Sequence, residues 1–227
     1  MSLPTTSSPT HLLILGGGTA GTMIANKVHK HLPDWTVTIV DKDDIHDYQP
    51  GYLFIPFGMN TPEQIRKTKR RYINEHANLV FGEIDRVDPD EKTVALVDGR
   101  TLDYDYLVIA TGTSPRPDQT PGMLGDEWHK SIAEFYTYEG AIALRDELSK
   151  WDGGRLVVHV TEMPTWRPVA PLEFTFLADD GCPSTACASR PSWCSSRRWT
   201  ARSPSRWPAA SSGTPWPIAT SPSRPTS

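Results

Sequence analysis

The feature that most constrains the fold of this chain is a glycine-rich turn near its N-terminus, GGGTAG at positions 16–21. A short apolar run, HLLIL at 11–15, comes directly before the turn and is typical of a strand buried in a parallel sheet. After the turn, apolar residues recur at helical spacing at Met23, Ile24 and Val28. A strand, a glycine turn and a helix in this order predict the first unit of an α/β fold.

The glycines of this turn fit the spacing G-x-G-x-x-G at Gly16, Gly18 and Gly21. In this motif the first glycine permits a tight turn, the second lets a pyrophosphate approach the backbone, and the third lets helix and strand pack closely. Free N–H groups at the start of the helix, around Thr19 and Ala20, attract anions. We therefore predict that the turn binds a dinucleotide. The alternative is a tight strand–helix turn that binds no ligand.

An acidic residue follows the turn at the distance typical of a dinucleotide site. The stretch TVTIVD at 36–41 is a second β-branched strand, and it ends at Asp41, 20 residues after Gly21. A carboxylate at this place can accept a hydrogen bond from a ribose hydroxyl. The two strands and the helix between them form a βαβ unit. We place Asp41 and its neighbour Lys42 in the candidate site.

A later motif points to the identity of the dinucleotide. The stretch DYLVIATGTSPRP at 105–117 resembles the second signature of flavoproteins with two dinucleotide-binding domains, the pyridine nucleotide-disulfide oxidoreductase superfamily. The stretch FGEIDRVDPDEKTVALVDG at 81–99 is similar to the three-stranded β-meander of that family. The resemblance implies that the first unit binds FAD, with backbone near the adenine at one point and a strand end near the cofactor at another. The residues it adds to the candidate site are Ile84, Ala110, Thr111 and Gly112.

Two further stretches narrow the resemblance to one branch. HDYQPGYLFIPFG at 46–58 and VTEMPTWRPVAPLEFTFLADD at 160–180 resemble the sulfide:quinone oxidoreductases, and the whole resemblance covers 11–180. It implies electron transfer from a small-molecule donor, sulfide, through FAD to a quinone acceptor, with peripheral contact to the inner face of the cell membrane. The alternatives are a type II NADH dehydrogenase-like flavoprotein and a nucleotide-binding module without catalysis. No second glycine fingerprint follows GRLVVHV at 154–160, which disfavours NADH as the donor.

The chain departs from this resemblance at a position that matters for catalysis. The resemblance implies a redox cysteine directly before Pro168, where this chain has Arg167. An arginine carries no sulfur and cannot form a persulfide. The cysteines of the chain, Cys182, Cys187 and Cys194, fit no compact zinc pattern. We therefore assign no catalytic and no metal-binding residue, and we expect the chain to be an inactive fragment of an oxidoreductase.

The last part of the chain, 181–227, differs in composition from the rest. It holds six of the 23 basic residues, all arginines, and no Lys, Asp or Glu, which leaves 17 basic and 27 acidic residues and a net charge of −10 in 1–180. Such an acidic body disfavours nucleic acid as a partner. Codons permitted for the tail can encode a structured continuation of the family in another frame. We therefore interpret the tail as disordered and out of frame after a one-base deletion at codon 181; the alternatives are a Ser/Pro/Arg linker and an RNA-binding arm.

The expected organisation is a FAD-binding domain at 1–118, the beginning of a second dinucleotide-fold domain at 119–180, and the tail at 181–227. The fold class is α/β: a Rossmann-like FAD-binding unit with a three-stranded β-meander, the start of a second Rossmann-like unit, and an irregular C-terminal tail. Periodicity also predicts helices at 62–77 and 131–151.

Three smaller expectations concern location and loops. The first ten residues lack the basic region of a signal peptide, and no run approaches the roughly 20 apolar residues of a membrane span, so we expect a cytoplasmic protein. The basic run RKTKRR at 66–71 is interpreted as a solvated helix face; the alternative is a patch that binds anionic membrane lipid. His46 and Tyr48 either line the flavin pocket or pack within their own loop.

Overall fold

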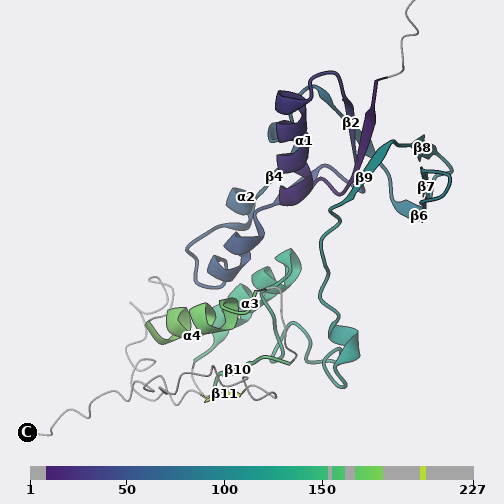
Figure 1. Ribbon diagram of the computed structural model, residues 1–227. Coiled ribbons are helices and arrows are strands. Elements are labelled where there is room, and N and C mark those ends of the chain that lie inside the picture. The colour runs from purple at the N-terminus through teal and green to yellow at the C-terminus, as the bar shows by residue number, and fades with distance from the viewer. Residues whose placement is uncertain (1–8, 153–154, 162–166, 181–199, 203–227) are drawn as a thin grey trace, which may run out of the picture. The chain divides into compact units, whose positions relative to one another are not determined.

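The structure is a computed structural model of the chain, and it describes residues 9–152, 155–161, 167–180 and 200–202 (Figure 1). These residues fall into two compact units. The described part of the first unit is 9–152, and the other three stretches belong to the second. Each unit is described by itself.

The core of the first unit is a four-stranded parallel sheet (Figure 1). Its strands are β1 (His11–Leu15), β2 (Thr36–Asp41), β5 (Ala77–Phe81) and β9 (Tyr106–Ile109). The spatial order is β5-β2-β1-β9 and every neighbouring pair is parallel, so the order reverses at β1. Ligands of such sheets bind beyond the carboxyl ends of the strands at the point of reversal. The predicted Rossmann-like unit is confirmed.

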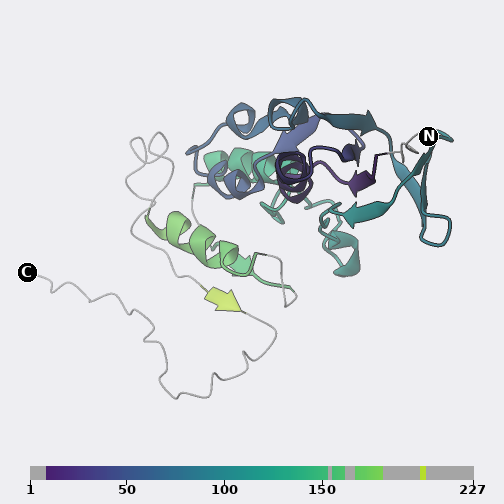
Figure 2. The same ribbon diagram turned by 45° about the horizontal axis from the view of Figure 1, so that its top comes forward.

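Both faces of this sheet are covered, which explains why β1 is buried along almost its whole length. Successive side chains of a strand point to opposite faces. Leu12 and Ile14 therefore cluster with α1 (Thr19–His31) on one face. Leu13 and Leu15 cluster with the antiparallel meander on the other. Figures 1 and 2 show the helix and the meander on the two sides of the sheet.

Along the chain, the meander lies between β5 and β9 of the parallel sheet, as predicted. It consists of β6 (Ile84–Asp88), β7 (Thr93–Leu96) and β8 (Thr101–Asp103), paired antiparallel in that order. Val94 and Leu96 of β7 are buried and alternate with more exposed neighbours, because successive side chains of a strand point to opposite faces. The turn into β8 contains Gly99 at φ +90°, a left-handed conformation that glycine adopts at low cost.

The predicted helix at 62–77 is wrong beyond its first turn. A capping box at Thr61 starts α2 (Pro62–Ile65), but the chain then becomes extended and forms β4 (Arg66–Thr68) and a 3-10 turn, η2 (Lys69–Arg71). β4 pairs antiparallel with β3 (Ile45–Asp47). Strand pairing and ion pairs with a distant segment outweigh the local helical pattern, since helix propensity is only a weak prior.

Helix α3 (Tyr138–Lys150) is shorter than the predicted helix at 131–151. Its N-cap is Thr137, whose side chain accepts a hydrogen bond from the Gly140 N–H. Before the cap, the Glu134 carboxylate binds the backbone N–H groups of the next residues, so the chain there does not continue the helix. The first unit extends to 152 and therefore includes α3, although the sequence-based division placed this helix in 119–180.

Two 3-10 helices complete the first unit. η1 (Gln49–Phe54) lies in the stretch after β3, and Tyr52 at its centre clusters with Ile65 and with Ala141 of α3. η3 (Pro117–Gln119) follows β9 at some distance along the chain. The cluster around Tyr52 is thus formed by three segments that are far apart in the sequence.

The second unit contains β10 (Val157–His159), α4 (Ala170–Asp180) and β11 (Thr200–Arg202). β10 and β11 pair in parallel, so Thr200–Arg202 of the predicted irregular tail form a strand. The remaining tail residues, 181–199 and 203–227, and the cysteines at 182, 187 and 194 lie outside the described residues.

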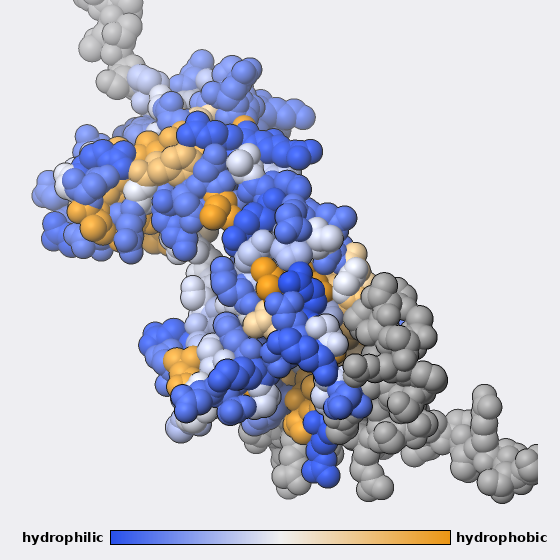
Figure 3. Space-filling model, turned by 180° about the vertical axis from the view of Figure 1, so that it is seen from behind, coloured by the Kyte–Doolittle hydropathy of each residue, from blue (hydrophilic) through white to orange (hydrophobic). Residues whose placement is uncertain are grey.

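Within the described stretches, no helix combines the length and the apolar character that crossing a membrane requires. On the face shown in Figure 3, hydrophilic surface predominates and hydrophobic residues gather in separate patches.

Candidate dinucleotide site

The candidate site lies at the carboxyl ends of β1, β2 and β9, where the strand order of the sheet reverses. Backbone hydrogen bonds hold the turn after β1 against both neighbouring strands. The Gly16 N–H donates to the Val40 carbonyl at 2.8 Å, and the Ala110 N–H donates to the Leu15 carbonyl at 2.7 Å. The glycine turn and the end of β9 are therefore brought together, as the candidate residues required.

The three glycines of the turn have different surroundings. Gly16 has φ +98°, and a Cβ atom there would collide with the backbone of Ala110 and Thr111 at the end of β9. A Cβ atom on Gly21 would collide with the carbonyl oxygen of Gly16, so the absence of a side chain lets α1 start close against β1. Gly18 has no described atom within 4 Å of the place of its Cβ. Two glycines thus serve close packing, and the space beside the third is open.

The N-terminus of α1 is exposed at this open side. The N-cap residue, Gly18, has no side chain that could accept a hydrogen bond from the first N–H groups of the helix. The first turn contains no acidic residue, and Gly18, Thr19 and Ala20 are all exposed. Thr22 is turned inward, and its hydroxyl donates to the Gly17 carbonyl at 3.1 Å. N–H groups and the helix dipole therefore face the open side, which favours an anion such as a pyrophosphate.

Asp41 lies beside the turn at the end of β2, with its side chain 14% exposed. Its Oδ2 accepts a hydrogen bond from the Gly17 N–H at 2.6 Å, and its Oδ1 accepts one from the Lys42 N–H at 2.7 Å. The Oδ1 atom also lies 3.2 Å from the Lys69 Nζ atom. Asp41 therefore fixes the backbone of the turn and remains partly exposed beside it.

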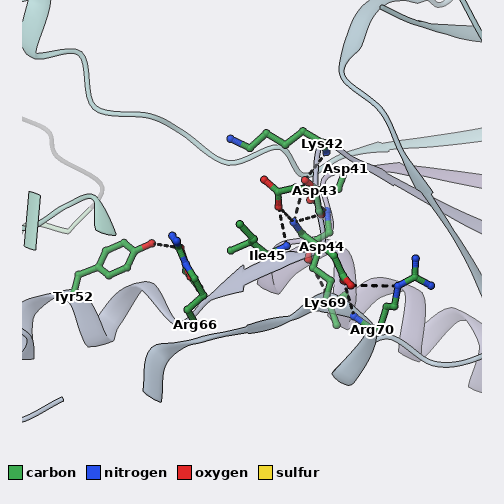
Figure 4. A network of polar contacts seen from close by, with 12 residues as sticks. Asp41, Lys42, Asp43, Asp44, Ile45, Tyr52, Arg66, Lys69 and Arg70 are labelled. Carbon is green, nitrogen blue, oxygen red and sulfur yellow. Dashed lines mark hydrogen bonds and ion pairs between the residues drawn. The ribbon is translucent and has the colours of Figure 1, made fainter. Parts of the chain in front are cut away.

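Lys69 is the functional residue that sequence reasoning missed (Figure 4). The basic run at 66–71 was interpreted as a solvated face, yet Lys69 is 4% exposed, and among the described residues it is the only charged residue that is buried. Its ammonium group contacts Asp41 and Asp43. The signal in the sequence was the complementary charge of the stretches DKDD at 41–44 and RKTKRR at 66–71, which a search within each stretch does not detect.

The charges around Lys69 order the segment that follows β2. Burial alone would raise the pKa of the Asp43 carboxyl, but hydrogen bonds from Lys69 and from the Ile45 N–H, together with the charge of Lys69, hold this pKa below its usual value. Asp44 pairs with Arg70 at 3.3 Å. Asp43 is therefore ionised at neutral pH and paired with the buried lysine.

The remaining candidate residues differ in their surroundings. Lys42 is exposed, and its side chain points away from the cluster of Lys69 (Figure 4). Gly82, two positions before Ile84, donates its N–H to the Asp41 carbonyl at 2.9 Å, while the Ile84 side chain packs against the meander core. Beyond the end of β9, Thr111 is exposed and Gly112 has φ +73°.

A second polar network ties the segment after β3 to α3. The Arg66 guanidinium donates to both Asp47 oxygens at 2.8 Å and lies 3.4 Å above the Tyr138 ring, while the Tyr52 hydroxyl donates to Asp47 at 2.9 Å. Burial and the hydrogen bond to Asp47 raise the pKa of the Tyr52 phenol, and the same carboxylate raises the pKa of Arg66. The network packs these elements of the first unit together.

His46 and Tyr48 differ in their surroundings. The His46 ring lies against Tyr72 with 4.8 Å between the ring centroids, and its Nδ1 atom is buried without a hydrogen-bond partner in the described part of the chain. Tyr48 is 60% exposed. Arg167 belongs to the second unit, where its carbonyl accepts a hydrogen bond from Ala170. Nowhere in the described ranges do three or more His, Cys, Asp or Glu residues gather in a way that could hold a metal ion.

The sequence of this chain is similar to those of several known proteins. The chain is 28% identical over 131 residues to the mitochondrial sulfide:quinone oxidoreductase of Dictyostelium discoideum, an alignment that covers 57% of this chain and 29% of the relative. It is also 28% identical over 155 residues to the NAD(P)H coenzyme A polysulfide/persulfide reductase of Pyrococcus horikoshii, covering 65% of this chain and 33% of the relative. The chain thus spans about a third of the length of these relatives.

The fold is shared with a solved structure. The sulfide:quinone oxidoreductase of the hyperthermophilic bacterium Aquifex aeolicus superposes with a TM-score of 0.62 at 22% identity, covering 75% of this chain and 39% of that one. The family model of pyridine nucleotide-disulphide oxidoreductases matches residues 10–158, which contain the parallel sheet, the glycine turn, the meander and the end of β9. On this match, the chain belongs to the pyridine nucleotide-disulphide oxidoreductase family.

Proposed function

We propose that the glycine turn binds the ADP half of FAD, and that this chain is part of a flavin-dependent oxidoreductase. One observation carries the proposal. The N-terminus of α1 is exposed and uncapped, the space beside Gly18 is open, and the Asp41 carboxylate lies at the same edge of the sheet. A dinucleotide needs this combination, since its pyrophosphate binds N–H groups and its ribose binds an acceptor.

Each candidate residue has a role in this proposal. Exposed N–H groups at Thr19 and Ala20 bind the pyrophosphate. Asp41 accepts a hydrogen bond from the adenosine ribose. Backbone near Ile84 lies against the adenine, and Gly112 lies near the cofactor, as the family resemblance implies. Bound FAD supplies a ring that accepts and releases electrons, and the protein holds and orients it.

The electron donor and acceptor are proposed from the resemblance. The names of the relatives include a sulfide:quinone oxidoreductase and an NAD(P)H-dependent reductase of polysulfide and persulfide. We favour sulfide as donor and a quinone as acceptor, because the sequence after β10 lacks a second glycine fingerprint. Arg167 stands where the sulfide branch has a redox cysteine, so we assign no catalytic residue to this chain and expect no turnover with sulfide.

A binding experiment on the full chain tests the proposal. Calorimetric titrations with FAD, ADP, FMN and NADH are expected to show that FAD and ADP bind and compete for one site, while FMN, which has no adenosine diphosphate, does not bind. Binding of FMN but not of ADP would contradict the proposal. Binding of NADH with no binding of FAD would assign the site to a nicotinamide dinucleotide instead.

A matched pair of variants tests where the ligand binds. Gly18→Val places a branched side chain in the open space beside the helix N-terminus and is expected to abolish the binding of both ADP and FAD. Lys27→Ala changes an exposed residue in the middle of the same helix and is expected to bind as the unchanged chain does. Equal affinities of the two variants for ADP would show that the nucleotide binds elsewhere.

A further inference from the structure

The buried lysine below the turn has a function that the family match does not assign. We propose that Lys69 is a positioning residue for the nucleotide: it holds Asp41 so that the carboxylate accepts a hydrogen bond from only one hydroxyl of the adenosine ribose. The inference rests on the proposed function, because it concerns how the same site binds ADP.

The Lys69 ammonium donates two hydrogen bonds to Asp43 and forms an ion pair with Asp41. Its Nζ atom lies 2.7 Å from the Asp43 carbonyl oxygen, 3.0 Å from Asp43 Oδ1 and 3.2 Å from Asp41 Oδ1. An ammonium group has three N–H donors and no acceptor. Lys69 is 4% exposed and its ammonium lies against oxygen atoms of Asp41 and Asp43, so it is not positioned to bind a phosphate of the ligand. Its charge acts on the nucleotide only through Asp41 and the local field.

The acceptors of Asp41 are nearly all used. A carboxylate offers about four lone-pair sites. Oδ1 accepts a hydrogen bond from the Lys42 N–H and its other side lies against the Lys69 ammonium in an ion pair, while Oδ2 accepts a hydrogen bond from the Gly17 N–H. One site on Oδ2 remains. A carboxylate with two free oxygens can bind both hydroxyls of a ribose, whereas this one has room for a single hydroxyl.

Lys69 also fixes the turn itself. Its Cδ atom lies 3.2 Å from the place of a Cβ atom on Gly17, and the Gly17 N–H is the group that occupies Asp41 Oδ2. The lysine stem therefore packs against the turn while its charged end holds the carboxylate below it. Loss of the ammonium would leave Asp41 held by two backbone N–H groups alone, and it would open Oδ1 to a second hydroxyl.

The charge of Lys69 matters for an anionic ligand. Three carboxylates, Asp41 at the end of β2 and Asp43 and Asp44 after it, form ion pairs with Lys69 and Arg70. Removal of the lysine charge leaves a net negative charge beside the position proposed for the pyrophosphate. Repulsion of this kind weakens with rising salt, and a loss of packing alone does not.

The first test uses the unchanged full chain with ADP, 2′-deoxy-ADP and 3′-deoxy-ADP in calorimetric titrations. We expect one deoxy analogue to bind about tenfold or more weakly than ADP, because a hydrogen bond to a charged acceptor is lost. The other analogue is expected to bind within about twofold of ADP, because a hydroxyl that does not contact the carboxylate costs little to remove. Equal weakening by both analogues would show that Asp41 binds two hydroxyls and would overturn the inference.

The second test compares Lys69→Met with Lys67→Met. Lys67 is on β4 and donates to the exposed Glu63 carbonyl, so its replacement removes a charge near the same segment without touching Asp41. Lys69→Met is expected to bind ADP about tenfold more weakly at low salt, to regain part of this loss at high salt, and to lose the difference between the two deoxy analogues. Lys67→Met is expected to keep both the affinity and the difference.

The outcomes separate the inference from the proposed function. If the unchanged chain binds neither ADP nor FAD, the proposed function fails and the inference fails with it. If the unchanged chain binds ADP and Lys69→Met, with an unaltered melting transition, keeps the affinity and the discrimination, only the inference fails. If Lys69→Met does not fold, the comparison of deoxy analogues on the unchanged chain still decides.

Discussion

The three glycines of the motif have different surroundings in the structure. Gly16 and Gly21 lie against backbone atoms, while Gly18 faces open space. The motif predicts that Gly21 serves packing and that Gly18 leaves room for a ligand, and the structure adds that Gly16 packs against the end of β9. That division follows from the positions of α1 and β9 beside the turn.

The first prediction separates stability from binding at the turn. Gly21→Ala puts a Cβ atom against the Gly16 carbonyl and is expected to lower the free energy of unfolding by about 1–3 kcal/mol. Gly18→Ala, at φ −70°, meets no described atom and is expected to change the free energy of unfolding by about 0.5 kcal/mol or less. Urea unfolding of both variants measures the difference. Equal destabilisation would contradict the packing role of Gly21.

The second prediction concerns the alkaline stability that Tyr52 confers. Burial and the hydrogen bond to Asp47 raise its pKa above the usual value of 10.0, so above that pH the folded state holds a proton that the unfolded state has lost. The contribution of Tyr52 to the free energy of unfolding is therefore fully present below pH 10, and it is lost as the pH rises further. In Tyr52→Phe this contribution is absent, so the free energy of unfolding should fall less steeply above pH 10.

Tyr52→Phe also has an expected effect at neutral pH. It loses the hydrogen bond to the Asp47 carboxylate, which costs about 1.5–3 kcal/mol. Tyr48→Phe is the control, because Tyr48 is exposed and should behave as the unchanged chain at every pH. Denaturant unfolding between pH 7 and pH 11 gives both quantities. Parallel curves for Tyr52→Phe and Tyr48→Phe would rule out the assigned role.

At the scale of elements, the prediction from sequence succeeded where local pattern and tertiary contact agree. The strand, turn and helix at the N-terminus and the meander are present as expected. The helix predicted at 62–77 is not, because Arg66 binds Asp47 across 19 positions and Lys69 binds Asp43 across 26. These pairings draw the segment into a strand and a 3-10 turn. Periodicity within one window contains no information about them.

The third prediction tests which face of the meander supports the sheet. Leu96 at the end of β7 is 3% exposed and packs in the core cluster, while its neighbour Val97 is 64% exposed. Leu96→Ala should lower the free energy of unfolding by about 2–5 kcal/mol, because it leaves a cavity. Val97→Ala should change it by about 0.5 kcal/mol or less. A similar loss in both variants would mean that the meander does not cover the sheet.

At the scale of the whole molecule, the origin of the stretch 181–227 is a question for the gene. The sequence predicts a one-base deletion at codon 181, and β11 at Thr200–Arg202 is the described part of this stretch. Sequencing the DNA that encodes 160–227 is expected to show that one added base opens a frame encoding a structured continuation of the family. Codons that hide no such peptide would refute the deletion and leave the arginine-rich stretch to be tested as a binding arm.

The sequence by itself determined the Rossmann-like unit, the meander and the place of the glycine turn, since strand alternation, helical spacing and glycine geometry are set by residues close in the chain. Only the tertiary structure decided that Lys69 is buried and which groups Asp41 binds. It also decided that the helix predicted at 62–77 stops after its first turn. A charged side chain is buried only where partners replace its water. Those partners are supplied by strand pairing between distant segments, which becomes determined only when the sheet has formed.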